Sequence, residues 1–246
     1  MVTMTVHQRH VVAEALAAFS EPSHHSSCLG VLLVGSPGVG LSTCVEQIKS
    51  VTDRKCIELK SVDFHSRVSL GVHLGRILGL CNVKTSMKKK VSLPLVSLIK
   101  IIGVTLFVLE DAHDLETPEA CAEIIKEFAK LKGRVPEVKL LMTIHIKEMV
   151  GAFFLESSLS KFFSLITVKP MAKNDLELFL VGRIKPTIDS YPMCDRRLLD
   201  SIHEYSQGSI GRAILVADLL RHILNCTKEE ERSADEMIRV ITTINW

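Results

Sequence analysis

Residues Val31–Cys44, with the sequence VLLVGSPGVGLSTC, constrain the fold of this chain more than any other stretch. Val31–Val34 have the length and the β-branched content of a buried strand. Gly35–Ser42 then follow the pattern G-x-x-x-x-G-[K]-[ST] of a phosphate-binding loop in every position but one, because Leu41 stands where the pattern has lysine. The stretch therefore predicts a strand, a loop suited to a polyphosphate, and a helix.

The residue types of this loop explain its expected chemistry. Glycines at three positions let successive backbone N–H groups face an anion, and the helix that opens at Thr43 adds a favourable N-terminus. Ser42 can place its hydroxyl on Mg²⁺, whereas Leu41 cannot neutralise phosphate charge, so phosphate affinity and transition-state stabilisation should both suffer. We assign contacts with ATP to Gly35, Ser36, Pro37, Gly38, Val39, Gly40, Leu41, Ser42 and Thr43. The alternative is a glycine-rich turn that binds no ligand.

Composition limits the class of protein. The chain has 246 residues, of which 47% are hydrophobic and 24% charged, as in a globular fold that buries a real core. No apolar run is long enough to span a membrane, and residues 1–22 lack the apolar region of a secretory peptide, so we expect a cytoplasmic protein without a membrane partner. A net charge of +2 does not by itself demand nucleic acid.

Strand and helix patterns alternate along the chain, which favours a doubly wound parallel α/β sheet. We predict five strands, near residues 31, 56, 106, 141 and 167, between helices. From Asn174 onward the pattern is wholly helical and predicts a small lid. The expected domains are 1–170 for the nucleotide-binding part and 171–246 for the lid. The helices are predicted at residues 6–20, 43–50, 68–80, 95–102, 120–132, 175–184, 195–205 and 209–225.

Two acidic residues end the apolar strand at 104–109. In phosphate-loop nucleotidases such a strand delivers one acid to magnesium and a following acid to the attacking water. We assign the contact with magnesium to Glu110 and the positioning of the attacking water to Asp111. Thr143 and His145 lie near the end of the next strand, where such a fold carries a sensor of the γ-phosphate, although a satisfied core Thr and His explain them equally well. A solvated turn is the alternative for the two acids.

A lysine run between residues 82 and 94 is the sharpest charge feature of the chain. It has no acid inside the segment and consists of Lys84, Lys88, Lys89 and Lys90. These four residues are the best candidates for contact with the backbone of duplex DNA. A solvated loop is the alternative.

The chain resembles AAA+ proteins, and within them the TniB/TnsC family of transposition regulators, relatives of the origin-recognition and MuB-like ATPases. The resemblance extends over nearly the whole chain. It rests on an N-terminal helix ending in a His-rich turn, on LLVGSPGVGLST, on FVLEDAHDL with its His113, on SLSKFF, and on YSQGSIGRAI in the lid.

The resemblance implies an ATP- and Mg²⁺-dependent homo-oligomer, a ring or a filament on duplex DNA, that links target-selector proteins to a transposase. It places Lys161 where such proteins present an arginine finger, and Arg212 near a second sensor. Three departures predict weak or absent hydrolysis: Leu41, the inverted order of Glu110 and Asp111, and a lysine in place of the finger arginine, which cannot form a planar fork.

Two other functions remain open from the sequence. One is a pseudo-ATPase scaffold, similar to a clamp-loader or origin-recognition subunit, that keeps the fold without useful nucleotide binding. The other is a signalling ATPase of the STAND type, although no sensor or repeat domain follows in this sequence.

Overall fold

The computed structural model describes residues 6–20, 28–60, 64, 69–79, 93–115, 118–146, 161–184, 196–226 and 233–243. By density of internal contacts the chain divides into two compact units. We call Val11–Val34 with Cys44–Thr167 the sheet unit, and Met1–His10 with Gly35–Thr43 and Val168–Trp246 the lid unit. The phosphate loop therefore belongs to the lid unit.

Five parallel strands form one sheet, which confirms the predicted α/β class and strand number. Their order is β2-β3-β4-β1-β5. The inner strands β1 and β3 are almost wholly buried, whereas the edge strand β2 alternates between exposed and buried residues, with Lys55, Glu58 and Lys60 exposed. The strands are β1 (Gly30–Gly35), β2 (Lys55–Lys60), β3 (Val104–Glu110), β4 (Lys139–His145) and β5 (Phe163–Val168).

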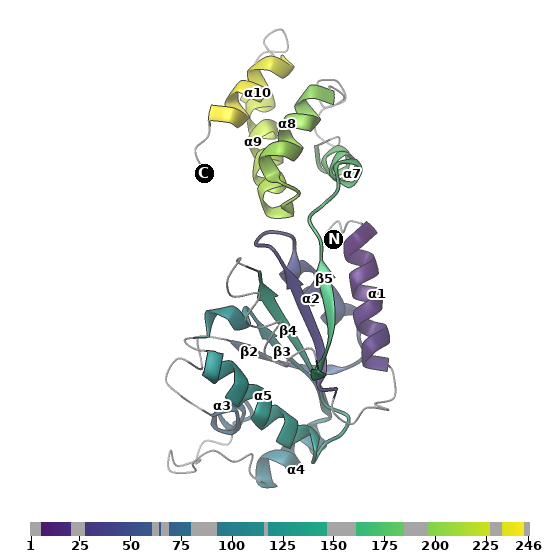
Figure 1. Ribbon diagram of the computed structural model, residues 1–246, viewed down its shortest axis with the longest axis vertical. Coiled ribbons are helices and arrows are strands. Elements are labelled where there is room, and N and C mark those ends of the chain that lie inside the picture. The colour runs from purple at the N-terminus through teal and green to yellow at the C-terminus, as the bar shows by residue number, and fades with distance from the viewer. Residues whose placement is uncertain are drawn as a thin grey trace. The chain divides into compact units, whose positions relative to one another are not determined.

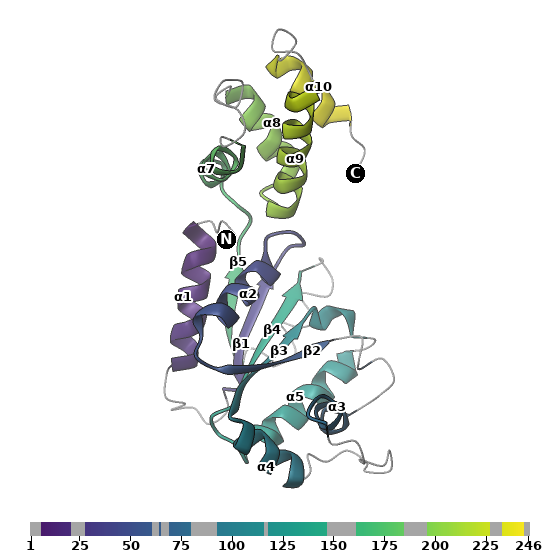
Figure 2. The ribbon, with the colours of Figure 1, turned by 180° about the vertical axis from the view of Figure 1, so that it is seen from behind.

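Helices cover both faces of this sheet. Figure 1 shows α5 in front of the sheet, and Figure 2, from behind, shows α2 in front of it. The ring of Phe107 on β3 packs edge-on against Phe128 of α5, with ring centroids 5.5 Å apart, in the main core cluster. The described α-helices that precede β4 in the chain are α1 (Val6–Ser20), α2 (Leu41–Val51), α3 (Leu70–Ile77), α4 (Leu93–Ile102) and α5 (Pro118–Lys132).

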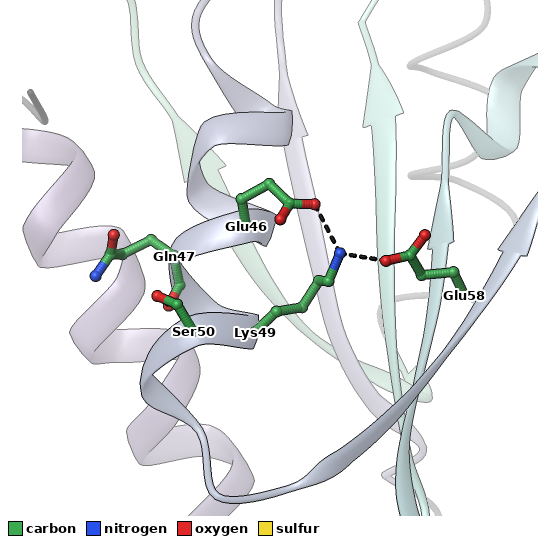
Figure 3. Close-up of polar contacts among 5 residues, drawn as sticks. All are labelled: Glu46, Gln47, Lys49, Ser50 and Glu58. Atoms are coloured by element: carbon green, nitrogen blue, oxygen red, sulfur yellow. Dashed lines mark hydrogen bonds and ion pairs between the residues drawn. The ribbon is translucent and has the colours of Figure 1, made fainter. Parts of the chain in front are cut away.

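An ion-pair cluster joins α2 to the edge strand. Figure 3 shows the Nζ of Lys49 between the carboxylates of Glu46, at 2.6 Å, and Glu58 on β2. Partial burial alone lowers the pKa of Lys49, but its hydrogen bonds to Glu46 and Glu58 outweigh burial and raise that pKa above its ordinary value. Both carboxylates are exposed, so the cluster contributes about 1 kcal/mol at most to stability.

The lid unit has its own core of four helices among the described residues. Leu180, Leu198, Ile202, Ala213 and Leu220 are fully buried in it. Three of the helices match the predicted ones within a few residues; the fourth, at the C-terminal end, was not predicted separately. They are α7 (Lys173–Ile184), α8 (Arg196–Ser206), α9 (Ile210–Cys226) and α10 (Ala234–Thr243).

Candidate functional site: the phosphate loop and the acidic strand end

The phosphate loop leaves β1 and turns into α2 through two left-handed glycines. Gly38 has φ 81° and Gly40 has φ 92°, a conformation that residues with a Cβ rarely adopt. The N–H of Val39 donates to the carbonyl of Ser36 at 3.3 Å and closes a tight turn. Within the described residues, the backbone N–H groups of Gly38 and Gly40 have no protein acceptor. A nest of this kind presents N–H groups to an anion.

Other parts of the lid unit hold the carbonyl side of the loop. The N–H of Gly211, in the first turn of α9, donates to the carbonyl of Gly38 at 3.0 Å. The buried side chain of Gln8 on α1 donates from Nε2 to the carbonyl of Val39 at 3.3 Å. Because a trans peptide points its C=O and N–H in opposite directions, the N–H of Gly40 faces away from Gln8. The N–H groups of Gly38 and Gly40, unlike that of Val39, are thus left available for a ligand.

The three residues after the loop glycines differ in exposure. The side chain of Leu41 is only 2% exposed, while that of Ser42 is exposed and that of Thr43 half-buried. Leu41 begins α2, whose first-turn N–H groups have no acceptor within the helix. The helix start therefore offers N–H groups and a hydroxyl, but a buried apolar side chain takes the place of the expected cation.

The acid pair lies in the sheet unit at the end of β3. Asp111 has a left-handed backbone, with φ 52° and ψ 46°, and its N–H donates to Thr143 Oγ1 at 2.9 Å. One carboxylate oxygen of Asp111 lies 3.2 Å from Nε2 of His145. Glu110, the last residue of β3, is half-buried. Thr143 and His145, the two residues considered as sensors, thus both contact Asp111.

The hydroxyl of Thr143 should stabilise the protein by accepting the N–H of Asp111, and this can be tested by substitution. Replacing Thr143 by valine keeps the shape but leaves the N–H of Asp111 without this acceptor, and Thr143 is only 1% exposed. We expect Thr143→Val to lower the free energy of unfolding by about 1–3 kcal/mol, measured by urea denaturation. Thr143→Ser keeps the hydroxyl and should cost clearly less. Equal losses in both variants would show that packing, and not the hydrogen bond, matters at this position.

The remaining candidates are placed differently. Lys161 is exposed just before β5, and Arg212 is exposed in the first turn of α9, where its backbone N–H donates to Ser209 Oγ at 3.3 Å. Neither side chain forms an ion pair with another described residue. The proposed DNA contacts lie outside the described residues: Lys84, Lys88, Lys89 and Lys90.

No group of three or more His, Cys, Asp or Glu side chains able to hold a metal ion occurs among the described residues. Ser42 has an exposed hydroxyl and Glu110 a half-buried carboxylate, and each is a hard oxygen donor of the type that Mg²⁺ prefers. Each residue therefore suits, by itself, the metal contact that the sequence predicts. None of the described helices is both long and apolar enough to cross a bilayer.

Comparison with known proteins places the fold. No protein-family model matches the sequence, and no curated protein sequence is significantly similar to it. By structure the chain is similar to the ORC2 protein of Aeropyrum pernix, solved in ADPNP and ADP complexes, with TM-score 0.62 and 15% identity over 97% of this chain and 68% of that one. It is also similar to domain III of the replication initiator DnaA of Thermotoga maritima, with TM-score 0.61 and 13% identity over 98% and 93% of the two chains.

A third solved structure, Cdc6p of Pyrobaculum aerophilum, has TM-score 0.60 and 17% identity over 92% of this chain and 64% of that one. The chain thus spans about two thirds of the two archaeal proteins. At identities this low the structural similarity shows the fold alone, which is an AAA+-like α/β fold with a five-stranded parallel sheet. The narrower resemblance to transposition regulators stays a prediction.

Proposed function

We propose that this protein is an ATP-binding AAA+ regulator of DNA transposition with weak or absent hydrolysis. In this proposal it works in the cytoplasm, assembles as a ring or filament on duplex DNA, and links target-selector proteins to a transposase. The observation that carries the proposal is a phosphate loop with its glycine geometry in place and a buried leucine at the lysine position. This combination favours binding over turnover.

Nucleotide binding is supported by the loop geometry. The glycines at 38 and 40 adopt the conformation that a nest requires, and lid-unit donors occupy the carbonyls of Gly38 and Val39. The similar ORC2 protein of Aeropyrum pernix was solved with ADPNP and ADP. Loss of one charge-assisted contact at Leu41 should weaken binding by about 1.5–3 kcal/mol without abolishing it.

Weak hydrolysis is supported by three positions. The loop lacks its cation at Leu41, and Lys161 is a point charge that cannot bridge two phosphate oxygens in a planar fork. Asp111, the acid assigned to the attacking water, contacts His145 through its carboxylate and Thr143 through its N–H. An acid held in this way is less free to orient water.

DNA binding and assembly rest on sequence and analogy. The lysine run gives one subunit a few phosphate contacts, and a ring or filament would repeat them and increase avidity. Among similar structures, ORC1 of Aeropyrum pernix was solved in complex with DNA, and a katanin structure concerns self-assembly. The role in transposition is inferred from the sequence resemblance to TniB/TnsC proteins.

A salt series of duplex binding tests the proposal. Wild type is compared with a variant in which Lys88, Lys89 and Lys90 are changed to Ser, with and without ATP, while oligomer size is followed by light scattering. We expect the variant to lose affinity and to show a shallower salt slope under conditions where wild type assembles. Identical slopes and affinities would show that the run is a solvated loop.

A scaffold that binds no nucleotide is the second candidate. The observation that favours it is the burial of Leu41, because a buried leucine is what a loop kept only for its shape would contain. The scaffold function would be favoured if folded wild type assembles normally but binds neither ATP nor ADP.

A further inference from the structure

The described groups of the lid unit that bind the carbonyls of the phosphate loop are neutral. The carbonyl of Gly38 receives the backbone N–H of Gly211, and the carbonyl of Val39 receives the side-chain amide of Gln8. His7, one residue before Gln8, accepts the N–H of Lys169 at its Nε2, and among the described residues no hydrogen bond joins it to the loop itself. The contacts that hold the loop thus bring no positive charge to it.

Gly211 is the residue of α9 whose missing side chain would face the loop. A Cβ at this position would lie 3.7 Å from the Cα of Gly38 and 3.9 Å from its carbonyl oxygen, which is ordinary van der Waals contact. Gly211 is not among the residues with positive φ, so a longer side chain fits its backbone. The nearby Ser209 also lies close to Gly38, because a Cβ on Gly38 would be 2.2 Å from Ser209 Oγ.

Two further described residues beside these contacts, Leu41 and Arg212, hold no fixed cation against the loop. Leu41, in the lysine position, is buried and apolar. Arg212 follows Gly211 but is exposed, and no hydrogen bond or ion pair joins its side chain to another described residue. A phosphate loop cradles the α- and β-phosphates with backbone N–H groups, whereas a lysine serves the β- and γ-phosphates. This loop retains the backbone N–H groups for the inner phosphates, but it has leucine in place of the lysine that serves the outer ones.

We propose that this loop does not select a nucleoside triphosphate and binds the diphosphate at least as tightly. The inference rests on the nucleotide binding proposed above. The γ-phosphate adds negative charge that must leave water, and without a cation its desolvation is not compensated. The backbone N–H groups can still hold the two inner phosphates. Leu41 and Gly211 are the positions that determine this specificity.

Calorimetric titration of ATP and ADP, each with Mg²⁺, tests the specificity. Wild type should give a ratio of the ATP Kd to the ADP Kd of one or more. Gly211→Arg should tighten ATP binding by about tenfold and ADP binding by less, because a guanidinium adds a charge-assisted contact with the outer phosphate. Gly211→Ala is the matched control, since it adds a side chain without charge and should leave the ratio unchanged.

Two results would contradict this inference while leaving the proposed nucleotide binding intact. The first is a wild type that binds ATP measurably more tightly than ADP, so that the ratio of the two Kd values falls below one. The second is a selective loss of ATP affinity in Arg212→Ala, which would show that this exposed arginine supplies the missing charge. If folded wild type binds neither nucleotide, the inference falls together with the proposed nucleotide binding. The outcomes therefore separate failure of the specificity from failure of the site.

Discussion

Replacing Leu41 by lysine is expected to tighten ATP binding by about tenfold while turnover stays low. The new ammonium would add a charge-assisted contact with the β- and γ-phosphates beside N–H groups that are already in position. Turnover should not follow, because Asp111 still contacts Thr143 and His145, and Lys161 remains in place of an arginine.

This substitution also has a cost that must be measured. The side chain of Leu41 is 2% exposed, so a lysine there either buries its charge or leaves an apolar cavity. We expect a loss of about 1–3 kcal/mol in the free energy of unfolding. Leu41→Met, which keeps the volume and adds no charge, is the control for affinity and turnover. A Leu41→Lys enzyme with brisk ATP hydrolysis would contradict the role given to the contacts of Asp111.

Gly30→Ala is expected to destabilise the protein by about 2–4 kcal/mol, measured by urea denaturation. A Cβ on Gly30 would lie 1.9 Å from the carbonyl oxygen of Leu140 and 2.7 Å from its carbonyl carbon. Backbone atoms inside a sheet cannot move aside, because the N–H of Leu140 also donates to the carbonyl of Leu29 at 3.0 Å. The close approach of β1 and β4 therefore requires glycine at this position.

Gly133→Ala provides a matched control for this prediction. Gly133 follows α5, is exposed, and would place a Cβ no closer than 3.6 Å to any atom, so its replacement should change stability by about 0.5 kcal/mol or less. A Gly30→Ala protein as stable as Gly133→Ala would show that the strands separate at little cost.

Much of the fold could be predicted because it depends on local sequence patterns. The inner strands β1 and β3 are short apolar runs, and the edge strand β2 shows the alternation that a half-exposed position requires. The helix α10 was missed although it has a local signal. Ser233 caps it by accepting the N–H of Glu236 at 3.1 Å, and Ser followed three residues later by Glu is the pattern of a capping box.

The candidate site was harder to predict because its contacts join distant parts of the chain. Gln8 reaches Val39 across 31 residues, and Asp111 reaches Thr143 across 32. Sequence patterns do not specify which residue of α9 meets the loop. The resemblance gives Arg212 a role as a second sensor of the nucleotide, which stays a prediction, while the loop itself is contacted by the N–H of Gly211, one residue earlier. A difference of one residue rotates a helical side chain by about 100° and changes which group faces a ligand.

Calorimetric titration of ATP against wild type, Ser42→Ala and Ser50→Ala, with Mg²⁺ and with chelator, tests the central claim most directly. Ser50 lies at the far end of the same helix, where its hydroxyl donates to the carbonyl of Gln47, so it controls for general effects on α2. We predict saturable binding to wild type and Ser50→Ala, and a several-fold weaker affinity of Ser42→Ala in Mg²⁺ that disappears with chelator. No binding to wild type, or equal affinities of all three proteins in Mg²⁺, would contradict a nucleotide site at this loop.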